Sequence, residues 1–154
     1  MPLALVLFSR LEDAVGGRPQ PRTVAGLGPN RLRELGLSHA KATAIDGLAQ
    51  RHLARTLDTD DLDGLSDEQV VAALTATNGI GLWTARMFLI HQLRRPDVLL
   101  ASDLGIRQAV ERAWTLPGLP TIDEVREIGE RWSPQCTYAV ALLWILLRPV
   151  PASA

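Results

Sequence analysis

The sequence has a single cysteine and three histidines, which is too few for most cofactor-binding motifs. Cys136 is the only cysteine, so the chain forms no internal disulfide and lacks the four thiolates of a typical iron–sulfur cluster. The histidines, His39, His52 and His91, are too widely spaced for a zinc motif. We therefore expect a cytoplasmic protein that requires no cofactor.

Long apolar runs are also lacking. No run reaches the roughly 18 residues that a membrane span needs, because Arg, Asp or Pro interrupts the longest candidates. Residues 1–8 are apolar but have no basic leader and continue into the charged residues 10–13. This pattern favours a helix over a signal peptide, and we expect no membrane partner.

Positive charge is scarce as well. The formal net charge is −1, and Lys41 is the only lysine. The first 55 residues nevertheless carry more basic than acidic side chains, while acidic residues concentrate at 58–63. The distribution is compatible with a basic face that binds nucleic acid, and equally with an evenly solvated surface.

Helical periodicity is the strongest positive feature, and no strand alternation accompanies it. Residues 19–29 are rich in proline and glycine, and we expect turns there with one short helix after Thr23. Capping residues are placed at Ser38, Ser66 and Thr121. We expect an all-α multi-helix bundle, forming one domain over residues 1–148 with a short tail at 149–154. The expected helices cover residues 3–15, 31–35, 39–57, 82–93, 103–114 and 134–147, with two more that begin after Ser66 and after Thr121.

Two of these helices flank the turn Asn78-Gly79-Ile80-Gly81. Glycines allow positive φ and a close approach of another backbone. The helix that follows has free N–H groups and the positive end of its dipole at its start, which suits a phosphate. An ordinary helix–turn–helix corner is the alternative interpretation of the same residues.

Four segments together resemble the helix-hairpin-helix DNA glycosylase superfamily, particularly its alkylpurine branch, which includes bacterial 3-methyladenine DNA glycosylase II. The first segment, residues 78–85, contains the glycine hairpin. The second, residues 97–107, contains an aspartate about twenty positions after the hairpin. The other two segments are residues 32–41 and 132–144. The resemblance implies a fold with a helix-hairpin-helix motif and a function in base excision repair on double-stranded DNA that contains damaged bases. It also implies a nucleoid-associated protein, and we expect a monomer.

In this resemblance Asp103 takes the position of the catalytic aspartate. Cleavage of an N-glycosidic bond develops positive charge on the sugar, and a carboxylate stabilises that charge and orients the attacking water. The alternative role is an N-cap, since aspartates in front of a helix commonly cap it. One residue can fill both roles.

The resemblance also assigns a base pocket and a hairpin site. Trp83, Trp144 and Met87 fall at the pocket positions, where indole rings would stack on a flipped alkylated base. The alternative is that these side chains pack in the hydrophobic core. For Trp114 and Trp132 we expect core packing. The DNA-binding hairpin comprises Asn78, Gly79, Ile80, Gly81 and Thr84. The backbone carbonyls of Thr75, Thr77 and Ile80 would hold a structural Na⁺ or K⁺.

Three departures from the family pattern bear on activity. Trp83 stands where bifunctional members carry a Schiff-base lysine, so we expect hydrolysis without lyase activity. Cys136 stands where the branch often has arginine, which could weaken the local pairing; the alternative is that Cys136 is a buried structural thiol. The chain also begins after a helix that relatives carry, which predicts either a truncated start or a reduced family member with impaired activity. We therefore expect a monofunctional glycosylase for alkylated purines, with a non-catalytic DNA-binding module and a structural bundle as alternatives.

Overall fold

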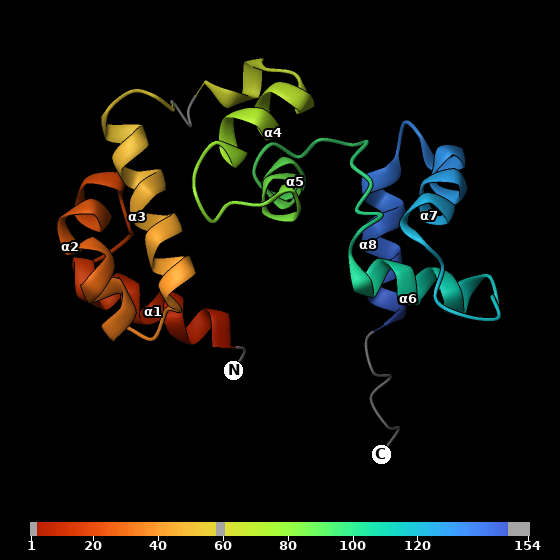
Figure 1. Cartoon of the computed structure of the whole chain (residues 1–154), viewed down its shortest axis with the longest axis horizontal. Coiled ribbons are helices and arrows are strands. Elements are labelled where there is room, and N and C mark those ends of the chain that lie inside the picture. The colour runs from red at the N-terminus through yellow and green to blue at the C-terminus, as the bar shows by residue number, and fades with distance from the viewer. Residues whose placement is uncertain (1–2, 58–60, 148–154) are drawn as a thin grey trace. The chain divides into compact units, whose positions relative to one another are not determined.

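The computed structural model describes residues 3–57 and 61–147, and every regular element in these residues is a helix (Figure 1). The all-α expectation is confirmed. The tail expected at 149–154, and residues 58–60 of the acidic segment, lie outside the described residues. None of the described helices is long and apolar enough to cross a membrane. The α-helices are α1 (Leu3–Val15), α2 (Pro21–Glu34), α3 (His39–Leu53), α4 (Asp67–Thr75), α5 (Leu82–His91), α6 (Leu104–Ala113), α7 (Ile122–Gly129) and α8 (Cys136–Leu146), with 3₁₀ turns η1 (Leu62–Gly64) and η2 (Glu130–Trp132).

Three helices begin at the caps that the sequence predicts. The Ser38 hydroxyl accepts a hydrogen bond from the backbone N–H of Lys41 at the start of α3. Ser66 and Thr121 form complete capping boxes at α4 and α7. Each cap satisfies an N–H group that the helix itself leaves without a partner and contributes about 1 kcal/mol.

Helix α2 corrects the expectation of a turn-rich stretch. Residues 21–34 are helical apart from a kink at Gly28, where φ is 69°. Pro21 occupies the first turn, where its missing N–H costs nothing and its fixed φ suits a helix. Pro29 follows the kink and so opens the second helical segment. The prolines therefore begin helical segments instead of interrupting one.

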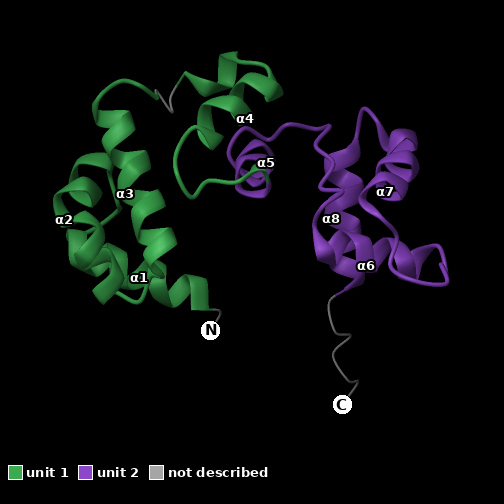
Figure 2. Ribbon diagram, in the orientation of Figure 1, with its two compact units in different colours: residues 1–82 green, residues 83–154 purple. Residues whose placement is uncertain are grey.

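The chain forms two compact units, residues 1–82 and residues 83–154 (Figure 2). Unit 1 has a small core from α1, α2 and α3, made by Leu11, Val24, Leu32, Ala42 and Ala49. Helix α3 also binds the end of α4, because Arg51 Nη1 donates to the Ala73 carbonyl (2.9 Å) and to Thr77 Oγ1 (2.6 Å).

Unit 2 is built around α6 and α8, whose buried side chains pack with Val125 of α7. Trp132 packs against this core as expected. Trp114 does not: it is 43% exposed, so its predicted core position is wrong. It is the C-cap that follows the last residue of α6, and its ring lies 5.8 Å from the Trp132 ring between centroids.

The loop before α6 is attached to the start of α8 by Asp97. Its Oδ1 accepts from the Cys136 backbone N–H (3.1 Å) and its Oδ2 from the Ser133 hydroxyl (2.6 Å). Hydrogen bonds from Cys136 and Ser133 lower the pKa of Asp97 below its usual value. Burial and the nearby Asp97 raise the pKa of Cys136 to about 12. Cys136 is therefore a buried, protonated thiol of low reactivity.

Candidate active site

Asp103 precedes the first residue of α6, and both oxygens of its carboxylate accept hydrogen bonds. Oδ1 accepts from the backbone N–H of Ile106 at 2.9 Å, which is the N-cap bond. Oδ2 accepts from Nε1–H of the Trp83 indole at 2.7 Å. A carboxylate has about four acceptor positions, so these two bonds leave room for a water or a ligand. Asp103 thus caps α6 and still presents free acceptor positions.

Gly105 lies beside this carboxylate and was not singled out from the sequence. A Cβ at this position would be 3.1 Å from Asp103 Oδ1 and 3.9 Å from Trp144 Cδ1. Leu147 Cδ1 would be 3.3 Å away, so the carboxylate, the indole and Leu147 pack closely around Gly105, where a side chain would be crowded. A glycine inside a helix destabilises it by about 1 kcal/mol relative to alanine. A glycine in the first turn of an expected helix is therefore the feature of the sequence that could have pointed to Gly105.

The three expected pocket residues all belong to unit 2. Trp83 is 47% exposed, which excludes a core role and leaves the indole face accessible while its N–H holds Asp103. Met87 lies one turn later on the same face of α5. Met87 and Trp144 are half-buried and pack against the core of unit 2. The structure brings Trp83 and Trp144 to the surroundings of Asp103, by a hydrogen bond and through Gly105 respectively.

The turn residues 78–81 of the hairpin belong to unit 1, and the two glycines among them have different surroundings. Gly79 has a φ of 85°, and a Cβ there would lie 2.8 Å from the Ala44 Cβ and 3.2 Å from the Ala40 carbonyl oxygen. Gly79 therefore allows the turn to pack on α3. Gly81 has no positive φ, and a Cβ there would meet no described atom within 4 Å. Only Gly81 leaves open space for another molecule.

Both glycines of the turn are nevertheless exposed. Asn78, Gly79 and Gly81 are exposed and Ile80 is half-buried. Thr84, in the first turn of α5, is exposed as well. The turn is closed by a hydrogen bond of 3.0 Å from the Ile80 N–H to the Thr77 carbonyl.

The carbonyls proposed for a monovalent cation come from this turn and from the end of α4. Thr75 is the last residue of α4, where carbonyls lack helical partners and the helix dipole is negative. The Thr77 carbonyl accepts one hydrogen bond, which leaves its second lone pair free, and its side chain is buried against Arg51. Carbonyl oxygens of this kind suit a hard monovalent ion. The described residues contain no group of His, Cys, Asp and Glu that could hold a metal.

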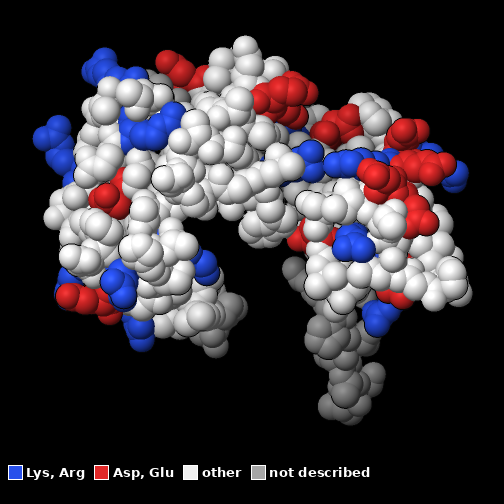
Figure 3. Space-filling model, viewed as in Figure 1, with Lys and Arg blue, Asp and Glu red and all other residues white. Residues whose placement is uncertain are grey.

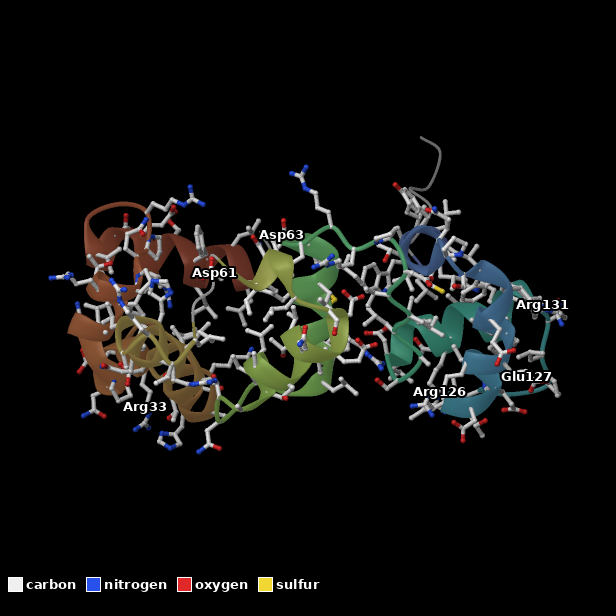
Figure 4. All side chains as sticks on the ribbon, turned by 90° about the horizontal axis from the view of Figure 1, so that it is seen from above. Arg33, Asp61, Asp63, Arg126, Glu127 and Arg131 are labelled. Carbon is white, nitrogen blue, oxygen red and sulfur yellow. The ribbon has the colours of Figure 1, made fainter. Side chains whose placement is uncertain are left out.

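The surface charge is mixed. On the face drawn in Figure 3, acidic and basic side chains occur in both units with uncharged surface between them. In unit 2, Arg126, Glu127 and Arg131 lie around α7 and η2 (Figure 4), and Arg126 pairs with Asp123 at 2.6 Å. An uninterrupted basic stripe is not visible on the drawn face.

Comparison with known proteins places these features in a family. The family model of the HhH-GPD superfamily of base excision DNA repair proteins matches residues 3–135. The chain belongs to this superfamily.

Among its HhH-GPD relatives, DNA-3-methyladenine glycosylase 1 of Schizosaccharomyces pombe is 32% identical over 144 residues, covering 92% of this chain and 63% of the relative. DNA-3-methyladenine glycosylase 2 of Escherichia coli is 32% identical over 126 residues, covering 82% of this chain and 42% of the relative. The chain thus spans about half the length of these curated relatives. The solved S. pombe 3-methyladenine DNA glycosylase in complex with abasic DNA matches with a TM-score of 0.84 and 31% identity, over 92% of this chain and 70% of that chain.

Proposed function

We propose that this chain is a monofunctional DNA glycosylase that excises alkylated purine bases of the 3-methyladenine type from double-stranded DNA, acting as a monomer. The observation that carries the proposal is the carboxylate of Asp103, which Trp83 and Ile106 hold at its two oxygens and which keeps free acceptor positions. The names of the relatives and the abasic DNA bound to one of them support the same chemistry.

Asp103 would act on the sugar of the damaged nucleotide. As the bond between C1′ and the base nitrogen breaks, its electron pair leaves with the base and positive charge develops on the sugar. The negative carboxylate stabilises this charge, and its free acceptor positions orient a water whose oxygen attacks C1′. The water's proton passes to the carboxylate or to solvent. The products are a free base and an abasic sugar carrying a hydroxyl.

Trp83, Trp144 and Met87 would hold the flipped base. Alkylation at a ring nitrogen makes a purine cationic, and a cation over an indole face gains roughly 0.5–2 kcal/mol. Met87 contributes a flexible apolar surface beside them. The reacting sugar would lie at Asp103 and the base toward Trp144, because the Asp103 carboxylate and the Trp144 indole both lie close to Gly105.

The hairpin would bind the phosphate backbone of the same DNA. Asn78, Gly79, Ile80, Gly81 and Thr84 form the contact, with N–H groups at the start of α5 as donors. The carbonyls of Thr75, Thr77 and Ile80 would hold Na⁺ or K⁺, which supplies positive charge close to the phosphate when it is bound. A cation is not required for the chemistry at Asp103.

The test of the proposed function is single-turnover release of methylated purines from alkylated duplex DNA. We expect base release with an intact abasic product, and strand breakage only after alkali or heat. The reason is that Lys41 is the sole lysine and Trp83 occupies the Schiff-base position. Trapping of a covalent protein–DNA adduct by borohydride would contradict the absence of lyase activity. Duplex binding without any base release would favour a non-catalytic module.

Trp83→Phe tests the bond that holds the carboxylate. The substitution retains an aromatic face but removes the N–H that donates to Asp103 Oδ2. A hydrogen bond to a charged group is worth about 1.5 kcal/mol or more, so we expect single-turnover base release to slow about tenfold while duplex affinity is kept. Trp114→Phe, on an exposed tryptophan bonded to neither group, is the matched control and should leave the rate unchanged. Equal rates for both variants would show that the bond does not contribute.

A further inference from the structure

His91, the last residue of α5, has a ring contact that the proposed mechanism does not use. Its imidazole lies nearly parallel to the Trp144 indole, with an interplanar angle of 6° and ring centroids 6.4 Å apart. The side chain is exposed, so the contact does not belong to the buried core. From the sequence, His91 is one of three histidines that are too widely spaced for a zinc motif.

The position of His91 on α5 connects it to the base pocket. It lies four residues after Met87 and eight after Trp83, so the three side chains follow one face of the helix. Trp83, at the start of this row, binds Asp103, and His91, at its end, stacks on Trp144. Trp144 Cδ1 in turn lies 3.9 Å from the Cβ position of Gly105, which the Asp103 carboxylate also approaches. The row therefore connects the contact with Asp103 to the contact with Trp144, and His91 is the member of the row whose ring can accept a hydrogen bond.

We propose that His91 is a specificity-determining residue that forms part of the base-binding wall with Trp144 and selects for cationic, N-alkylated purines. This inference rests on the proposed function and extends it. A neutral imidazole presents a flat face and a ring-nitrogen lone pair, which attracts a cationic purine and adds a hydrogen-bond acceptor at its edge. A phenyl ring would retain the stacking and lose the acceptor. A guanidinium would repel the cationic base.

Affinity for an uncleavable probe tests the proposal independently of catalysis. The probe is a duplex that carries one 7-methylguanine on a 2′-fluorinated sugar, and the reference is the same duplex with unmodified guanine. For the wild type we expect tighter binding of the methylated duplex. His91→Phe should reduce this preference about threefold, and His91→Arg should reduce it about tenfold, with the affinity for the reference duplex unchanged or, for arginine, increased. His39→Phe, on an exposed histidine of unit 1, is the matched control.

A second readout is the ratio of single-turnover release rates for 7-methylguanine and for the neutral base hypoxanthine. His91→Phe and His91→Arg should lower this ratio in the same order, and thermal unfolding should confirm that both variants fold like the wild type. The role of His91 is overturned if the preference for the methylated duplex stays within twofold of wild type in both variants. It is also overturned if the wild type shows no such preference. A preference that depends on His91 in a protein that releases no base would support the wall and contradict the proposed glycosylase activity.

Discussion

Asp103→Asn is expected to slow single-turnover base release by about a thousandfold or more, with duplex affinity unchanged or slightly increased. The substitution retains the shape of the side chain and removes the negative charge that would stabilise the developing cation on the sugar. That interaction forms mainly in the transition state, so its loss affects the chemical step and not the binding of DNA. Removal of one preorganised electrostatic contact typically costs 10²–10³ in rate, and here a full charge is lost.

The capping role of Asp103 can be separated from this effect. Asparagine caps a helix nearly as well as aspartate, so Asp103→Asn should unfold at the same temperature as the wild type, whereas Asp103→Ala should lose about 1 kcal/mol. Asp123→Asn, which removes a negative charge from the first turn of α7, is the control for net charge. Substantial and equal rates for wild type and Asp103→Asn would contradict the catalytic assignment and leave only the N-cap.

The parts of the fold that local chemistry determines were predictable from the sequence. Ser38, Ser66 and Thr121 mark helix starts because a capping side chain needs only the next three residues. The capping role of Asp103 was predictable for the same reason. Helix α2 was missed because a proline is compatible with the first turn of a helix as well as with a loop, and the kink at Gly28 allows two such starts within one segment.

The relations within the candidate site depend on contacts between distant residues, and these were not predictable from local pattern. Trp83 and Asp103 are twenty positions apart, so their hydrogen bond depends on how α5 and α6 pack. The stacking of His91 on Trp144 has the same origin. Resemblance to a family indicated which residues matter, but it gave Trp83 a stacking role and did not show that its N–H binds the carboxylate.

The second large effect is expected at the two hairpin glycines. Substitution of Gly79 should reduce the stability of the fold, and substitution of Gly81 should reduce the affinity for DNA. Gly79→Val places a β-branched residue at a φ of 85° and puts its Cβ 2.8 Å from the Ala44 Cβ. Backbone strain of 1–3 kcal/mol and the steric overlap with α3 should together lower the free energy of unfolding by about 3 kcal/mol or more. Urea unfolding measures this loss directly.

Gly81→Val introduces the same side chain where a Cβ would meet no described atom within 4 Å, so the free energy of unfolding should remain within about 0.5 kcal/mol of wild type. If the proposed phosphate contact is correct, the valine occupies the space that the DNA backbone needs. Affinity should then fall about tenfold for damaged and undamaged duplexes alike, since phosphate contacts position the protein without distinguishing bases. The two variants carry the same added atoms two residues apart, so each serves as the control for the other. Unchanged binding of undamaged duplex by a folded Gly81→Val would show that the hairpin does not anchor the DNA.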